Sequence, residues 1–140
     1  GIADGVDIKM ELESDMLMSG FMQKRGEKGM FKSWAKRFFA LVWSEANLAE
    51  REMRYFEARD YCTRKQKGAI DLSQASEVNA VEIEGQRGLT IQTPGRLWEL
   101  LPASGEEAAE WLKTLQMLMA RKRGMAVVSS FSNMALSVIE

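Results

Sequence analysis

The spacing of apolar residues changes once along this chain of 140 residues, from a period of two to a period of 3.6. From Met18 to Leu101, short alternating apolar stretches are bounded by glycine, proline and charged residues, which is typical of antiparallel strands. Strands are predicted at residues 19–25, 36–43, 53–57, 68–72, 78–83, 89–93 and 96–101, with turns at 85–88 and 94–95. Seven short strands at this spacing indicate a mainly β barrel or sandwich.

The period of 3.6 predicts one amphipathic helix after the strands. Ser104 and Glu107 form a capping box at its start, in which the Ser104 hydroxyl accepts from the Glu107 N–H. The basic run 121–123 is placed in the last turn, where cations favour the helix dipole, and Gly124 is predicted to end the helix. The apolar stripe consists of Ala108, Trp111, Leu112, Leu115, Leu118 and Met119.

Three segments follow from this pattern. Residues 1–17 are polar and acidic and are read as a flexible lead-in, residues 18–123 as the folded domain, and residues 124–140 as a C-terminal tail. The lead-in lacks the basic start of a signal peptide, and no apolar run reaches the roughly 18 residues that a membrane-spanning helix needs. We therefore expect a cytoplasmic protein, and the absence of an initiator methionine indicates a piece of a longer chain.

Composition excludes several kinds of chemistry. The chain has no histidine and a single cysteine, Cys62, so the commonest general base, the commonest metal ligand and an internal disulfide are all missing. No phosphate-binding glycine loop follows a predicted strand. The net charge of -1 gives no general attraction for nucleic acid. The sequence therefore predicts a non-catalytic protein, and the alternative is an enzyme that uses only carboxylates or lysine. We expect no cofactor, no metal site and no nucleic-acid partner, and a monomer as an isolated domain.

Five segments, taken in order, resemble the pleckstrin homology (PH) domain family over about residues 18–120. The first resembles the family's opening Gly-x-Leu-x-Lys strand, the second its aromatic and basic second-strand signature, and the last its helix tryptophan. The resemblance implies a seven-stranded antiparallel barrel capped by a C-terminal helix, and a signalling module that binds lipid headgroups at peripheral membrane sites. The segments are Gly20–Lys24, Trp34–Leu41, Tyr55-Phe56, Gly68–Leu72 and Trp111.

The resemblance also implies an open end of the barrel, bordered by the loops joining strands 1–2, 3–4 and 6–7. Side chains alternate along a strand, so Lys24 shares the inward face of Met22 and Arg37 shares that of Phe39. Tyr55 is expected to approach from strand 3 and Lys67 from the 3–4 loop. These groups match a phosphorylated inositol ring. The alternative for Lys24 and Arg37 is a solvated strand end.

Positive charge is concentrated around this open end. Residues 24–37 hold six basic side chains and one acidic side chain, whereas the first 17 residues hold five acids and one lysine. Lys28 and Lys32 are candidate phosphate ligands, and Met30-Phe31 between them is a candidate membrane contact or a loop anchor on the barrel. The basic stretch from Arg59 to Lys67 is read mainly as a solvated loop.

Ala35 departs from the pattern of tight 3-phosphoinositide binders, which resemble Lys-xn-(Lys/Arg)-x-Arg across strands 1 and 2. Lys24 and Arg37 fit that pattern, but Ala35 removes its middle cation, and Lys36 points to the opposite face. Weaker or less selective binding is expected. Two functions therefore remain open: membrane targeting through phosphoinositide headgroups or an anionic surface, and protein interaction through a sheet edge or the tail.

Overall fold

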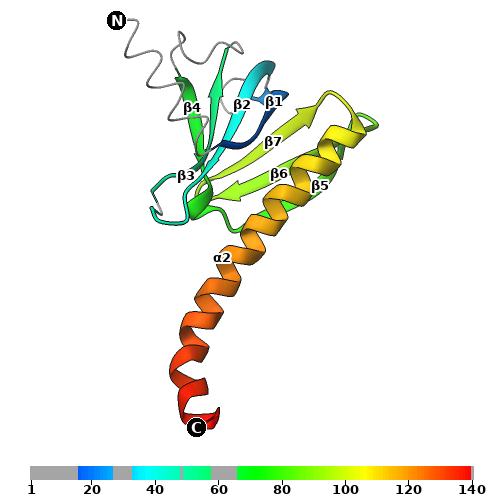
Figure 1. The fold of residues 1–140 in the computed structure, drawn as a ribbon. Helices are drawn as coiled ribbons and strands as arrows, with labels where there is room; N and C mark the ends of the chain where they lie inside the picture. The colour runs from blue at the N-terminus through cyan, green and yellow to red at the C-terminus, as the bar shows by residue number, and fades with distance from the viewer. Residues whose placement is uncertain (1–15, 27–32, 48, 58–65, 140) are drawn as a thin grey trace, which may run out of the picture.

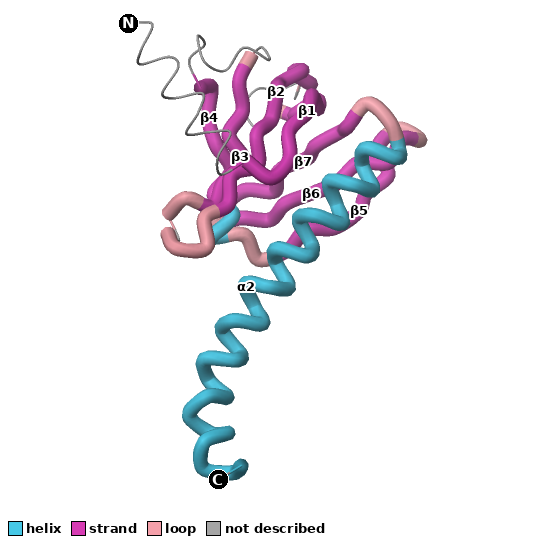
Figure 2. The backbone as a smooth tube through the Cα atoms, in the orientation of Figure 1, coloured by secondary structure: helices cyan, strands magenta, loops and turns pink. Residues whose placement is uncertain are grey.

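The computed structural model describes residues 16–26, 33–47, 49–57 and 66–139. Within these ranges, one sheet of seven antiparallel strands packs against one long helix (Figure 1; Figure 2). The predicted fold class is confirmed. The elements are β1 (Met16–Arg25), β2 (Trp34–Trp43), β3 (Arg51–Phe56), β4 (Gln66–Asp71), the 3-10 helix η1 (Leu72–Gln74), β5 (Glu77–Ile83), β6 (Gln86–Thr93), β7 (Arg96–Pro102) and α2 (Gly105–Ile139).

The first strand lies at the centre of the strand order β4-β3-β2-β1-β7-β6-β5. It pairs with β2 along nearly its whole length, but with β7 only through Met22, Gln23 and Lys24. β1 begins at Met16 rather than at residue 19, so this strand starts inside the predicted acidic lead-in. β2 and β3 likewise begin two residues earlier than predicted, because Trp34 and Arg51 continue the pairing.

Two tight turns join the last three strands. Glu84 and Gly85 both have positive φ, 48° and 78°, which is the backbone of a two-residue type I′ hairpin turn. The longer turn predicted at residues 85–88 is therefore wrong, since Gln86, Arg87 and Gly88 already pair with β5. At the other turn Gly95 has φ 77° after a proline, as a type II turn requires, and this prediction is confirmed.

The main core fills the space between the two halves of the sheet and the first half of α2. Alternation along the strands sends every second side chain into this core. The predicted core residues Phe39, Trp98 and Trp111 are all buried there. Its other large members include Met22, Leu41, Trp43, Met53, Ile70, Leu72, Val78, Leu89, Ile91, Leu100, Leu115 and Leu118.

A second apolar cluster, which the sequence reading did not predict, lies on the other face of β2. Phe38, Ala40, Val42 and Phe56 form it, and the Phe21 ring meets the Phe38 ring edge-on with centroids 5.2 Å apart. Both faces of β2 are therefore apolar, which explains why this strand reads as a continuous hydrophobic run.

The helix begins as predicted, because the Ser104 Oγ accepts a hydrogen bond of 3.1 Å from the Glu107 backbone N–H. Its predicted end is wrong, since α2 continues through Gly124 to Ile139 (Figure 1). Glycine ends a helix when it adopts positive φ, and Gly124 does not do so. Within the described residues, no helix is both long enough and apolar enough to cross a bilayer.

The basic residues 121 and 122 are not in the last turn of the helix, where the sequence reading placed them. The Lys122 Nζ donates to the backbone carbonyl oxygens of Leu72, Ser73 and Ala75 at 3.3, 2.8 and 3.0 Å. Arg121 donates to Glu45 at 2.8 Å. Lys122 therefore ties α2 to η1, and Arg121 ties it to the β2–β3 loop.

Candidate ligand-binding site

The pairing of β1 with β2 fixes the face on which the predicted cations lie. Met22 is opposite Arg37 and Lys24 is opposite Ala35, and directly opposed residues share a face of the sheet. Met22 is buried in the core, with 1% of its surface exposed. Lys24, Ala35 and Arg37 therefore all lie on the inward face, where β1 ends and β2 begins, as the alternation predicted.

Lys24 lies above two aromatic rings. Its Nζ is 5.1 Å from the ring centroid of Tyr55 and 5.7 Å from that of Trp98, distances at which a cation is attracted to the ring face. The two rings meet edge-on with centroids 6.1 Å apart, and the Phe39 ring lies 5.5 Å from Tyr55. The predicted pair of Lys24 and Tyr55 is thus brought together on an aromatic floor.

Tyr55 owes its position to the residue opposite it on β4. Tyr55 pairs with Gly68, and a Cβ built on Gly68 would lie 2.5 Å from the Tyr55 Cζ and closer still to its hydroxyl oxygen. Any residue with a side chain at position 68 would have to displace this ring. Gly68 therefore holds a place in the candidate site that the strand pattern alone did not reveal.

Arg37 and Lys67 are the other two predicted cations among the described residues, and they are less well placed to bind an anion than Lys24. The Arg37 Nη1 donates to the backbone carbonyl oxygen of Lys36 at 3.0 Å. Lys67 lies at the register shift between the partners of Tyr55 and Phe56, and its Nζ is 3.3 Å from Glu57 Oε1. Both partners of this ion pair are exposed, so it contributes little to stability, but it offsets the charge that Lys67 offers to an anion.

The sequence reading missed a cation beside the β6–β7 turn. The guanidinium carbon of Arg96 lies 3.4 Å from the ring centroid of Trp98. The Trp98 ring is held in turn by a hydrogen bond of 3.0 Å from its Nε1 to Thr93 Oγ1. The pairing of Lys24 with Leu100 places this turn beyond Lys24, toward the β1–β2 connection. The position of Arg96 directly after Pro94-Gly95 was the available signal, because the 6–7 loop borders the open end.

Lys28, Lys32, Met30 and Phe31 lie outside the described residues, as does most of the basic stretch before Lys67. The backbone N–H of Gly26 donates to the carbonyl oxygen of Ser33 at 2.8 Å, so the segment between them starts and ends beside Lys24 and Ala35. The roles of these four residues, as phosphate ligands and membrane contacts, therefore remain predictions.

The cations gathered at this end of the sheet are suited to binding an anion. Lys24, Arg37 and Arg96 supply donors of charge-assisted hydrogen bonds, and phosphate oxygens are strong acceptors for them. In the part of the chain that the structure describes, no group of three or more potential ligands is placed to hold a metal ion.

Two proteins of Dictyostelium discoideum are similar to this chain in sequence. A RAC family serine/threonine-protein kinase homolog is 30% identical over 97 residues, covering 69% of this chain and 19% of its own length. A leucine-rich repeat-containing protein is 22% identical over 107 residues, covering 72% of this chain and 7% of its own length. The chain thus matches a small part of each much longer relative.

Solved structures give the same fold. The C-terminal PH domain of pleckstrin, in complex with D-myo-Ins(1,2,3,5,6)P5, is similar with a TM-score of 0.59 and 26% identity, covering 73% of this chain and 93% of the pleckstrin chain. The sequence model of the PH domain matches residues 16–120. Because this match covers most of the chain and runs from β1 through the docked part of α2, the protein belongs to the PH domain family.

Proposed function

We propose that this domain targets its parent protein to membranes by binding a phosphoinositide headgroup, or an anionic membrane surface, at the open end of the barrel. PH domains are generally non-catalytic modules that commonly bind phosphoinositides or other ligands. The proposed ligands for phosphate are Lys24, Lys28, Lys32, Arg37, Tyr55 and Lys67, with Met30 and Phe31 in contact with the membrane. The protein would then be cytoplasmic and peripherally membrane-associated.

One observation carries the proposal: Lys24 is held over Tyr55 and Trp98 on the inward face. A lysine fixed on aromatic rings loses less rotamer freedom on binding than one that moves freely in solvent. Its directly opposite residue on β2 is Ala35, whose small side chain leaves the position between Lys24 and Arg37 without a third cation. Related chemistry is known for the pleckstrin domain, which has been solved with an inositol pentakisphosphate.

Ala35 sets the expected strength of binding. Each hydrogen bond between a charged donor and an acceptor contributes about 1.5–3 kcal/mol, so the missing cation lowers affinity by roughly tenfold or more. Arg96, beside the β6–β7 turn, offers a cation from another direction. We therefore propose modest affinity with broad selectivity among inositol headgroups.

The test is flotation with liposomes carrying each phosphoinositide in turn, at physiological salt. Lys24→Ala/Arg37→Ala should lose flotation, because it removes both inward cations. Lys113→Ala/Arg87→Ala is the matched control, since it removes the same charge from exposed positions of α2 and β6. Equal losses of flotation in both double variants would indicate that net charge alone attracts the domain to the liposomes. Flotation that changes neither with the phosphoinositide nor with the substitutions would refute the proposal.

A second candidate is a protein-interaction module of the same fold with little lipid binding, which Ala35 favours. A partner that still binds Lys24→Ala/Arg37→Ala would support it. The end of α2 extends beyond the sheet and away from the strands, so a partner could bind this part of the helix without covering the open end (Figure 2).

A further inference from the structure

The first half of β1 has a strand on only one side among the described residues. β2 pairs with β1 from Met16 to Arg25, whereas β7 pairs only with Met22–Lys24. β7 ends at Pro102 and the chain turns into α2 at Gly105, so the start of the helix faces Met18–Phe21 across the gap. An extended backbone edge in such a position is a template for an added strand.

A groove of about 500 Å³ lies between this edge of β1 and the start of α2. Its volume is within the range of roughly 300–1,000 Å³ that is usual for ligand clefts. Met18, Phe21, Leu101 and Trp111 supply apolar lining. Gly20 lies beside the Trp111 indole, since a Cβ on Gly20 would be in ordinary van der Waals contact with the ring atom Cζ2, at 3.8 Å. The groove therefore combines a backbone edge with an apolar floor.

The helix wall of the groove is acidic. Glu107 and Glu110 both line this wall and are exposed. They lie three residues apart, almost one turn, on the same side of the helix. The wall on the β2 side carries Lys36, whose Nζ is held 4.9 Å from the centre of the Phe21 ring. Two carboxylates on one wall favour an occupant with a cation beside the helix.

We infer that this groove binds an extended segment of a partner protein, which adds as a strand to the first half of β1. Alternate apolar side chains of the segment fill the floor around Trp111, and a lysine or arginine lies beside Glu107 and Glu110. This site is separate from the open end, because Lys24 and Arg37 lie on the inward face and do not line the groove. Peptide binding here would leave the proposed headgroup site accessible.

Two other occupants fit the groove less well. Residues 1–15 of this chain carry five acids and one lysine, so their charge has the same sign as the helix wall. A second copy of the domain would offer one of its edge strands, β4 or β5, but β5 carries Glu77 and Glu82 and no cation, and Lys67 of β4 is already paired with Glu57. An extended segment of a partner protein that carries both basic and apolar residues has neither of these disadvantages.

The test is selection of displayed random seven-residue peptides on the 140-residue chain, followed by NMR titration with the most enriched peptide. We expect a consensus of alternating apolar residues with a lysine or arginine, and shifts of the backbone amides of Ser19, Gly20 and Phe21 and of the Trp111 indole N–H. Glu107→Gln/Glu110→Gln should weaken binding about five- to tenfold, as for two lost surface ion pairs.

Glu82→Gln/Glu106→Gln is the matched control, since it removes two exposed carboxylates, from β5 and the first turn of α2, that do not line the groove. Its affinity should equal that of the wild type. The inference is overturned by the absence of an enriched consensus, by an acidic consensus, by amide shifts confined to another surface, or by dimerisation through β1. Headgroup binding by Lys24→Ala/Arg37→Ala is measured separately, so the two proposals fail independently.

Discussion

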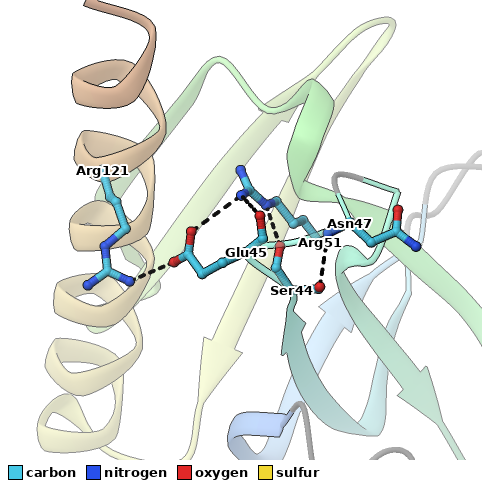
Figure 3. A network of polar contacts seen from close by, with 5 residues as sticks. All are labelled: Ser44, Glu45, Asn47, Arg51 and Arg121. Carbon is cyan, nitrogen blue, oxygen red and sulfur yellow. Dashed lines mark hydrogen bonds and ion pairs between the residues drawn. The ribbon is translucent and has the colours of Figure 1, made fainter. Parts of the chain in front are cut away.

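The ammonium group of Lys122 lies 2.8 Å from the backbone carbonyl oxygen of Ser73, and two further carbonyls of the same turn accept from it. These acceptors belong to η1 and to the residue after it, where the chain passes from β4 to β5. One side chain of α2 thus holds the junction between the two halves of the sheet. A second contact, from Arg121 to Glu45, reaches the β2–β3 loop, where Arg51 donates to the carbonyl oxygen of Ser44 (Figure 3).

Lys122→Ala should lower the free energy of unfolding by about 1–3 kcal/mol, because hydrogen bonds from a charged donor are lost and part-buried carbonyls are left without it. Urea denaturation measures this change. Lys113→Ala, on an exposed part of the same helix, should change stability by less than about 0.5 kcal/mol. Equal effects of the two substitutions would contradict a role for Lys122 in docking the helix. Arg121→Ala should cost less than Lys122→Ala, because both Arg121 and Glu45 are exposed.

Gly68→Ala should displace the Tyr55 ring, since the new methyl group would lie 2.5 Å from its Cζ. Overpacking of this kind typically costs about 1–3 kcal/mol. We expect lower stability by urea denaturation together with weaker headgroup binding, because Lys24 loses part of its aromatic support. Tyr55→Ala should relieve the clash, so Gly68→Ala should be nearly neutral in that background. If the changes in unfolding free energy of the two substitutions are additive in this double-mutant cycle, the close approach of the Tyr55 ring is not the reason that position 68 is a glycine.

The residues of the open end show what a single sequence can and cannot reveal. Alternation along β1 and β2 was enough to place Lys24 and Arg37 on the inward face, because the period of a strand fixes the side of every residue. Alternation could not reveal the role of Gly68, because that role depends on the Tyr55 ring of the neighbouring strand β3. Trp98 was predicted as core and is buried, yet its ring also meets both Lys24 and Arg96.

The helix shows the limits of local signals. Charge near a helix end and a following glycine are both stop signals, and together they predicted an end at Gly124. Lys122 has instead a tertiary partner in η1, far away in sequence, and Gly124 keeps its place inside α2. Neither fact follows from sequence spacing, because each depends on which distant element lies beside the helix.

Ala35→Lys should strengthen headgroup binding. Residue 35 lies directly opposite Lys24 on the inward face, so a lysine there would add a cation between Lys24 and Arg37. One added charge-assisted hydrogen bond of about 1.5 kcal/mol corresponds to roughly a tenfold gain in affinity. Calorimetric titration with soluble inositol phosphates at physiological salt measures it.

The matched control for this gain is Gln23→Lys, which adds the same charge next to Lys24 but on the opposite face, where Gln23 is paired with Lys36. Its affinity for inositol phosphate should remain close to that of the wild type. If both substitutions raise affinity equally, the gain comes from net charge. If neither does, the inward face is not the binding surface, and the protein-interaction function becomes the better explanation.

Gly124→Ala and Gly95→Ala should have opposite effects, although the change in side chain is the same. Gly124 has helical backbone inside α2, where alanine is favoured over glycine by about 1 kcal/mol, so amide exchange at residues 125–139 should slow. Gly95 has φ 77° in the β6–β7 turn, and a left-handed conformation costs an ordinary residue roughly 1–2 kcal/mol, so unfolding should need less urea. Faster exchange after Gly124→Ala would mean that the glycine ends the helix after all. Slower exchange confined to residues 125–139 would support a helix that continues through Gly124 past the sheet, because the added methyl group then favours the helical backbone.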